Sequence, residues 1–152
     1  MNKELSLKKD VMITLKGTQY ADGDSDSVEL TTVGQLYRRN GVYYLCYEES
    51  EATGFQGAKT TLKVEGSRRV TMRRTGERMR SQLIIEKGER HQCCYDTGYG
   101  TMTLGISGDH IESKTDDNGG HLSVRYTLDI NAVQASENEL LVDVEEYRST
   151  LS

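Results

Sequence analysis

Six arginines lie close together in the sequence and are the residues best suited to bind an anion. They are Arg68, Arg69, Arg73, Arg74, Arg78 and Arg80. A guanidinium group can bind a carboxylate or a phosphate through two parallel hydrogen bonds. Val70, Met72 and Arg74 share one side of a predicted strand. We therefore expect Arg74 to point inward near the mouth of the domain, while Arg69 and Arg73 point to solvent.

Three interpretations of this arginine stretch remain open. In the first, all six side chains are solvated on a hairpin or pair with acidic strands. In the second, Arg74 binds a small anionic ligand. In the third, the stretch contacts RNA. RNA-binding surfaces usually add exposed aromatic rings for base stacking, and this stretch has none. The net charge of −5 argues against bulk binding to nucleic acid or to anionic lipid. We therefore expect neither a nucleic-acid partner nor a membrane surface.

Tyrosines join Arg74 in a candidate ligand site. The chain has nine tyrosines and a single phenylalanine, and a phenol combines an apolar ring with a polar tip. These rings either cap the domain with their hydroxyl groups in water or line a cavity. On the second interpretation, the candidate ligand-binding residues are Tyr44, Arg74, Gln82, Tyr95 and Tyr126.

Metal and catalytic chemistry have little support in the sequence. Zinc would accept both His91 and Cys93, but no further ligands with a typical spacing accompany them. The three cysteines, Cys46, Cys93 and Cys94, are odd in number and are expected to be reduced, buried thiols. Nucleophile-elbow, phosphate-loop and His-Glu-x-x-His motifs are missing from the chain. We expect no metal, no cofactor and no enzymatic activity.

The elements that must position these residues are β-strands. Apolar residues alternate with polar ones through most of the chain, most cleanly over 122–130 and 140–144. This period of two is typical of antiparallel strands with one face in water. The predicted strands span 9–18, 27–38, 42–49, 58–65, 69–75, 79–87, 90–96, 100–107, 109–115, 121–131 and 138–147.

Short turn signals between the strands indicate that consecutive strands pair. Asn40-Gly41 is the strongest signal, because both residues tolerate the positive φ of a two-residue hairpin. Ser107-Gly108-Asp109 is predicted to be another turn, 22–26 a solvated loop, and 132–138 at most one or two helical turns. An open sheet of this size would expose its edges. We therefore predict an all-β fold, a closed or nearly closed antiparallel meander β-barrel of roughly 8–11 strands with a partly apolar interior.

Length and composition favour one domain. The chain has 152 residues, and a chain of this size usually forms a single core. We predict one domain over 10–147, with terminal extensions at 1–9 and 148–152. No apolar run is long enough for a membrane span, and the N-terminus lacks the apolar stretch of a signal peptide. A cytoplasmic location is expected, and both a monomer and a homodimer remain open.

Several short motifs along the chain carry a family resemblance. They are Thr32–Tyr37, Gly41–Glu49, Thr75-Gly76, Ser81–Leu83, Tyr95–Gly100 and Asn118–Gly120. Across about residues 10–147, the sequence resembles the YwiB-like bacterial proteins. The resemblance implies a lipocalin-like (calycin) barrel. It implies no particular activity, because that family has none assigned.

Two functional hypotheses follow from these observations. The first is a binding module for a small anionic or amphipathic ligand held in the barrel. The alternative is a protein- or RNA-interaction accessory that uses the basic Arg68–Arg80 face. A barrel whose interior is filled by side chains would exclude the first hypothesis.

Overall fold

The computed structural model describes residues 5–53, 55–77, 80–96 and 99–147. Ten β-strands and one short 3-10 helix lie within these ranges, and no helix there is long and apolar enough to cross a membrane. The elements are β1 (Leu5–Ala21), β2 (Asp24–Arg39), β3 (Val42–Glu48), η1 (Glu51–Thr53), β4 (Lys59–Glu65), β5 (Arg69–Thr75), β6 (Arg80–Glu86), β7 (Arg90–Asp96), β8 (Thr101–Asp116), β9 (Gly119–Ile130) and β10 (Val133–Glu146).

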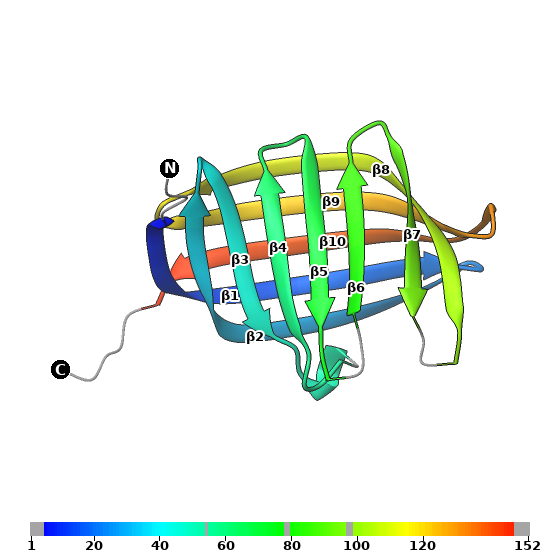
Figure 1. The fold of residues 1–152 in the computed structure, drawn as a ribbon, viewed down its shortest axis with the longest axis horizontal. Coiled ribbons are helices and arrows are strands. Elements are labelled where there is room, and N and C mark those ends of the chain that lie inside the picture. Colours follow the sequence, from blue (N-terminus) through cyan, green and yellow to red (C-terminus); the bar gives the residue numbers. More distant parts are fainter. Residues whose placement is uncertain (1–4, 54, 78–79, 97–98, 148–152) are drawn as a thin grey trace.

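All ten strands belong to one antiparallel sheet with the order β6-β5-β4-β3-β2-β1-β10-β9-β8-β7. Strands that follow one another in the chain pair with one another, except that β6 and β7 form the two ends of the sheet and β1 pairs with β10. Figure 1 shows the sheet curled into a barrel, in which β3–β7 form one wall and cross β1, β2 and β8–β10 of the other. The predicted all-β, nearly closed antiparallel barrel is confirmed.

The two-residue hairpin predicted at Asn40-Gly41 is also confirmed. These residues have φ angles of 53° and 79° and connect β2 to β3. Asp22 and Gly23 adopt similar φ angles, 53° and 80°, and connect β1 to β2. The prediction of a loop over 22–26 is therefore wrong, although these residues are exposed. Aspartate tolerates positive φ, and this allows the hairpin to close with only two residues.

A single strand, β8, replaces two strands of the prediction. The predicted turn at Ser107-Gly108-Asp109 is a β-bulge, where the pairing with β9 shifts between Gly108 and His110. The extra residue of a bulge reverses the inward and outward positions that follow it. Ile106 and Ile111 are therefore both buried, although one position is even and the other odd. Because of this change of parity, the single strand β8 has the sequence pattern of two strands separated by a turn.

The helical turn considered for 132–138 is likewise absent from the described residues. Asn131 and Ala132 form the β9–β10 turn with φ angles of 53° and 69°, and β10 begins at Val133. Alanine is an uncommon residue at positive φ. The sequence therefore carried no clear signal for this hairpin.

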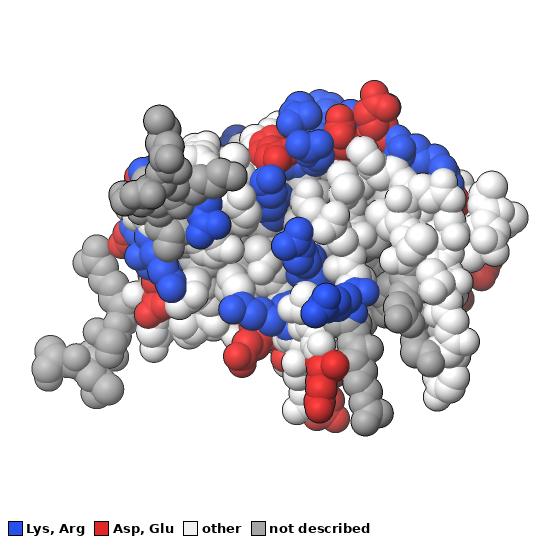
Figure 2. Space-filling model, viewed as in Figure 1, with Lys and Arg blue, Asp and Glu red and all other residues white. Residues whose placement is uncertain are grey.

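The core lies between the two walls. Its largest fully buried side chains are Ile13, Leu36, Leu45, Leu62, Ile85, Ile106, Ile111 and Leu122. Full burial of one such side chain stabilises the fold by about 1.5–3 kcal/mol. Charged side chains lie over the outside of the barrel, as Figure 2 shows for the face formed by β3–β7. The period of two in the sequence thus arises because alternate side chains of each strand face this core and the solvent.

Gly108 lies where the two ends of the sheet meet. The Gly88 N–H donates to the Gly108 carbonyl oxygen at 2.9 Å, and the Gly108 N–H donates to the Glu89 carbonyl oxygen at 3.1 Å. A Cβ atom at Gly108 would overlap the backbone of Glu86. The bulge of β8 can therefore approach the end of β6 only because residue 108 has no side chain.

A polar cluster joins the β8–β9 turn to β2 and β3. Asp117 Oδ1 accepts hydrogen bonds from Arg38 Nη1 and from the Tyr43 hydroxyl, the latter at 2.6 Å. The hydrogen bonds from Tyr43 and Arg38 hold the pKa of Asp117 below its usual range. The cluster links positions 74 residues apart in the chain, so it helps to fix the curvature of the sheet.

Gly108→Ala is expected to lower the free energy of unfolding by about 1–3 kcal/mol, because its methyl group must push the β6 backbone away. Gly17→Ala is the matched control, since a Cβ atom at Gly17 meets no atom within 4 Å. Urea unfolding of both variants measures the difference. Equal stability of the two variants would contradict the role assigned to Gly108.

Asp117→Asn is expected to lower the Tm at neutral pH and to lose this effect in acid. The pKa of Asp117 is depressed in the folded state. The ionised carboxylate therefore stabilises the fold above its unfolded-state pKa of about 3.9, and this contribution is lost as the pH falls through the folded-state pKa. Thermal unfolding of the wild type and Asp117→Asn, from neutral pH down into acid, tests this prediction. A Tm difference between the two proteins that does not change with pH would contradict the role assigned to the carboxylate.

Candidate functional site

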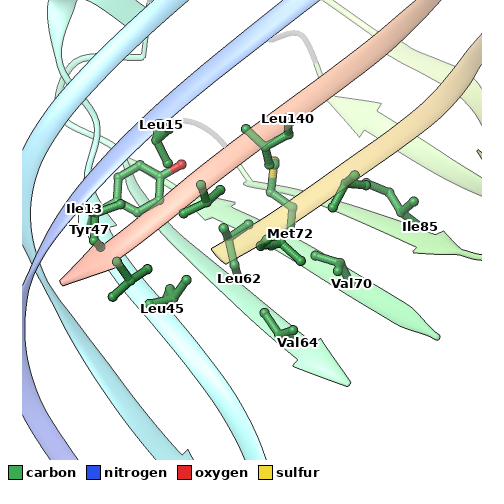
Figure 3. Packing of buried hydrophobic residues seen from close by; sticks show 14 of the residues in the cluster. Ile13, Leu15, Leu45, Tyr47, Leu62, Val64, Val70, Met72, Ile85 and Leu140 are labelled. Atoms are coloured by element: carbon green, nitrogen blue, oxygen red, sulfur yellow. The ribbon is translucent and has the colours of Figure 1, made fainter. Parts of the chain in front are cut away.

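A cavity of about 360 Å³ lies between the two walls of the barrel. Residues of β1, β2, β9 and β10 line it on one side, and residues of β3, β5, β6 and the η1 segment line it on the other. Figure 3 shows Leu15, Tyr47, Met72 and Leu140 gathered between strands of the two walls. The apolar lining consists of Leu15, Val28, Phe55, Met72, Leu83 and Leu140.

Gly17 leaves part of this space open. The side chains of Val11, Ile13 and Leu15 on β1 are buried in the core, and Gly17 is the next position on the same face. Gly17 itself lines the cavity, and a Cβ atom there would meet nothing within 4 Å. The cavity thus exists partly because one inward position carries no side chain.

A buried polar network forms part of the cavity wall. Glu49 Oε1 accepts hydrogen bonds from the Thr60 hydroxyl at 2.6 Å and from Arg74 Nη2 at 3.3 Å. Arg74 Nε also donates to Thr60 Oγ1 at 3.3 Å. The side chain of Glu49 is 1% exposed and that of Arg74 15%. Glu49 and Arg74 are therefore an ion pair largely removed from water, and each charge depends on the other for compensation.

The end of β3 and the η1 segment position this network. Glu49 directly follows β3 and continues the inward direction of Leu45 and Tyr47, which are both buried. Its N–H donates to the Ala58 carbonyl oxygen at 2.8 Å. Phe55 lies against Arg74, with its ring centre 3.8 Å from the guanidinium carbon, a distance at which ring and cation attract each other.

Two tyrosines add hydrogen-bond donors to the cavity. Burial raises the pKa of the Tyr47 phenol strongly, the charge of Glu49 raises it further, and Arg74 partly opposes both effects. Burial also raises the pKa of Tyr126, and Arg74 again opposes it. Both phenols therefore stay protonated at neutral pH, when each can donate one hydrogen bond.

The structure brings two of the predicted site residues together. Arg74 and Tyr126 both line the cavity, and Arg74 points inward as strand parity predicted. The side chain of Tyr95, another predicted site residue, lies outside the described residues. The role of Arg74 and Tyr126 in binding a ligand stays a prediction.

Tyr44 and Gln82 lie elsewhere, and the prediction that Tyr44 lines a cavity is wrong. Tyr44 stacks on Tyr37, with ring centres 4.8 Å apart. Gln82 is exposed and accepts a hydrogen bond from Arg73 at 3.1 Å. Successive side chains of a strand point to opposite faces, and both residues occupy the outward parity of their strands.

The other described arginines of the stretch lie on the outside of the barrel. Arg68 and Arg69 both form ion pairs with Glu65 and Glu86. Arg73 is exposed, as predicted. Residue 78, the fifth arginine of the stretch, lies outside the described residues.

Sequence reasoning missed Glu49, Thr60 and Phe55. The first two were detectable, because Glu49 continues the inward parity of Leu45 and Thr60 precedes Leu62 on the inward face of β4. Parity alone, however, does not pair either residue with Arg74. Phe55 lies in a segment without strand periodicity, so the pattern carried no signal for it.

The cysteines do not share one environment. All three are free thiols; Cys46 is buried as predicted and Cys93 is partly buried, whereas Cys94 is exposed. The prediction of buried thiols is therefore wrong for Cys94, because neighbours in a strand point to opposite faces. His91 lies 3.0 Å from Glu86 through Nε2. Within the described residues, no group of three or more His, Cys, Asp or Glu is arranged to hold a metal ion.

Comparison with known proteins places this barrel in a family. The sequence matches the family "Domain of unknown function (DUF1934)" over residues 13–142. The chain belongs to the DUF1934 family. It is 26% identical over 141 residues to the uncharacterized beta-barrel protein YwiB of Bacillus subtilis strain 168, across 91% of this chain and 96% of that protein.

The relationship extends to the fold of the family. The crystal structure of YwiB from Bacillus subtilis is similar with a TM-score of 0.82 and 21% sequence identity, over 95% of this chain and 96% of that chain. The family resemblance seen in the sequence motifs is confirmed. The DUF1934 family has no function in its description, so the cavity must be interpreted from its own chemistry.

Arg74→Met is expected to lower the free energy of unfolding by about 3–5 kcal/mol, because it leaves the Glu49 carboxylate buried without its cation. The double variant Glu49→Leu/Arg74→Met is expected to be more stable than this single variant, since it removes both charges. Urea unfolding of the wild type, Arg74→Met, Glu49→Leu and the double variant gives the coupling energy between the two residues. Strictly additive losses would show that the pair is not coupled.

The exposed neighbour Arg73 supplies the control for this cycle. Arg73→Met changes the same residue type on the outer face of β5, and its effect is expected to stay within about 0.5 kcal/mol of the wild type. A loss as large as that of Arg74→Met would indicate that arginine in β5 matters for a reason other than the buried pair.

Proposed function

We propose that the protein is a binding module for a small amphipathic molecule, held in the cavity between the barrel walls without a chemical step. The supporting observation is a cavity of about 360 Å³ with an apolar lining and a buried polar network in its wall. Small-molecule sites are typically concave, mostly apolar, supplied with a few fixed polar groups, and about 300–1,000 Å³ in volume. This cavity is at the lower end of that range and therefore suits a compact ligand.

Of the two ligand classes suggested by the sequence, the amphipathic class has more support than the anionic one. On the anionic-ligand interpretation of the sequence, Arg74 would bind the anion of the ligand. Its Nη2 and Nε atoms already donate to Glu49 and Thr60, and Phe55 lies against its face. A carboxylate of the chain thus takes the place expected for the ligand's anion, while the apolar lining remains available.

The alternative, a protein- or RNA-interaction accessory on the Arg68–Arg80 face, has less support. Arg68 and Arg69 are each paired with carboxylates of neighbouring strands. Figure 2 shows Asp and Glu side chains beside the Lys and Arg side chains along the upper edge of this face. Local pairing of opposite charges weakens the field that attracts a phosphate backbone.

Gly17→Leu tests the binding function. The neutral fluorescent probe N-phenylnaphthylamine is expected to bind the wild type saturably, and Gly17→Leu is expected to abolish binding because its side chain occupies the open space. Gly17→Ala is the matched control and should retain binding, since a methyl group fills little of the cavity. Circular dichroism verifies that both variants are folded.

Two results would count against this function. One is the absence of saturable binding to the wild type. The other is unchanged affinity of folded Gly17→Leu, which would place the bound probe outside the cavity.

A further inference from the structure

One oxygen of the buried carboxylate has no hydrogen-bond partner. Glu49 Oε1 accepts from Thr60 and Arg74, whereas the buried Oε2 accepts no hydrogen bond from any described residue. Tyr47 is close by, because the charge of Glu49 and a hydrogen-bonding interaction with its carboxylate both help to raise the pKa of this phenol. Tyr47 nevertheless forms no hydrogen bond of normal length and angle to Oε2. Native proteins rarely leave a buried acceptor unsatisfied, because the group has lost its water without a replacement.

The position of this oxygen connects it with a ligand. Glu49 lines the cavity, and its side chain is 1% exposed. Oε2 is closed to water in this structure, so a donor in the cavity reaches it only after a small shift of the surrounding side chains. Such a donor would supply the hydrogen bond that Oε2 lacks. A neutral or cationic donor would suit this acceptor, whereas another carboxylate would be repelled by it.

The charges that line the cavity favour the cationic donor. The lining contains three carboxylates, from Asp26, Glu49 and Glu139, and one guanidinium, from Arg74. Glu139 also lies 3.3 Å from Arg125, an exposed residue that is not part of the lining. The walls thus hold more negative than positive charge, although the nearby arginine stretch suggested the opposite.

We propose that the ligand is a small amphipathic amine whose ammonium group donates a hydrogen bond to Glu49 Oε2. Its aliphatic or aromatic body would lie against Leu15, Met72 and Leu140. This inference rests on the proposed binding function and specifies its ligand class. A hydrogen bond between an ammonium and a carboxylate is charge-assisted and stronger than a neutral one, and burial of the apolar body adds to the affinity.

Three probes with the same six-carbon chain separate the effect of the head group from that of the body. They are hexylammonium, hexanol and hexanoate, each titrated calorimetrically into the full chain at neutral pH. Hexylammonium is expected to bind at least about tenfold more tightly than hexanol, because only its head group makes the charge-assisted hydrogen bond. Hexanoate is expected to bind most weakly.

The three titrations distinguish this inference from the binding function on which it rests. If hexanol or hexanoate binds as tightly as hexylammonium, the amine proposal is overturned while the binding function stands. If none of the three binds while N-phenylnaphthylamine does, the amine proposal is overturned and the binding function stands; if no probe binds, both are overturned.

Glu49→Gln examines the acceptor directly. The amide removes the negative charge, so the preference for hexylammonium over hexanol is expected to fall by about tenfold. Arg73→Gln, whose side chain lies on the outer face, is the matched control and should keep the full preference. An unchanged preference in folded Glu49→Gln overturns the proposal.

Glu49→Gln removes the ion-pair partner of Arg74, and this change can itself disturb folding. A second variant keeps the test valid in that case. Asp26→Asn removes an exposed carboxylate of the cavity lining and leaves the buried pair intact. Its hexylammonium affinity is expected to fall by about twofold, as for other solvent-screened charges, with hexanol affinity unchanged. Equal losses for both probes would contradict a role of charge in the selection of the ligand.

Discussion

The fold depends on bringing the two ends of one sheet together. Every strand from β1 to β10 has a hydrogen-bonded neighbour, but β6 and β7 each have one on only one side. Exposed strand edges invite pairing with other chains, and curling the sheet brings these two edges close. Gly108 permits the closest approach, since its missing side chain lets the β8 bulge bond with the β6–β7 turn. The cavity follows from this closure, because it needs two walls that face each other.

The same closure places charges inside the barrel that could not be buried separately. Glu49 follows β3 and Arg74 belongs to β5, and the intervening strand β4 supplies Thr60 between them. A buried ion pair of this kind stabilises a fold only weakly compared with apolar residues of similar volume. Its hydrogen bonds, however, fix the direction of both charged groups. The proposed ligand would give this arrangement a function, because Glu49 Oε2 accepts no hydrogen bond from the described residues.

Much of the fold could be predicted because alternation is a local property of a strand. The inward direction of Arg74 and the hairpin at Asn40-Gly41 needed only the neighbours of each residue. The bulge at Gly108 could not be predicted, because it depends on contact with a distant turn and reverses the parity on which the prediction relied. The partner of Arg74 was missed for a related reason: parity shows that Glu49 points inward, but not which inward residue it meets.

The sequence by itself determined the all-β class, the antiparallel pairing of successive strands and the face on which most side chains lie. These features follow from a period of two and from short turn signals. Only the tertiary structure decided how far the barrel is filled, where Gly17 leaves space, and that Glu49 rather than a ligand neutralises Arg74. The physical reason is that the cavity depends on distances across the barrel, and the Glu49–Arg74 pair on how β3 and β5 are arranged on either side of β4. Those distances are set by the curvature and closure of the whole sheet and by no single strand.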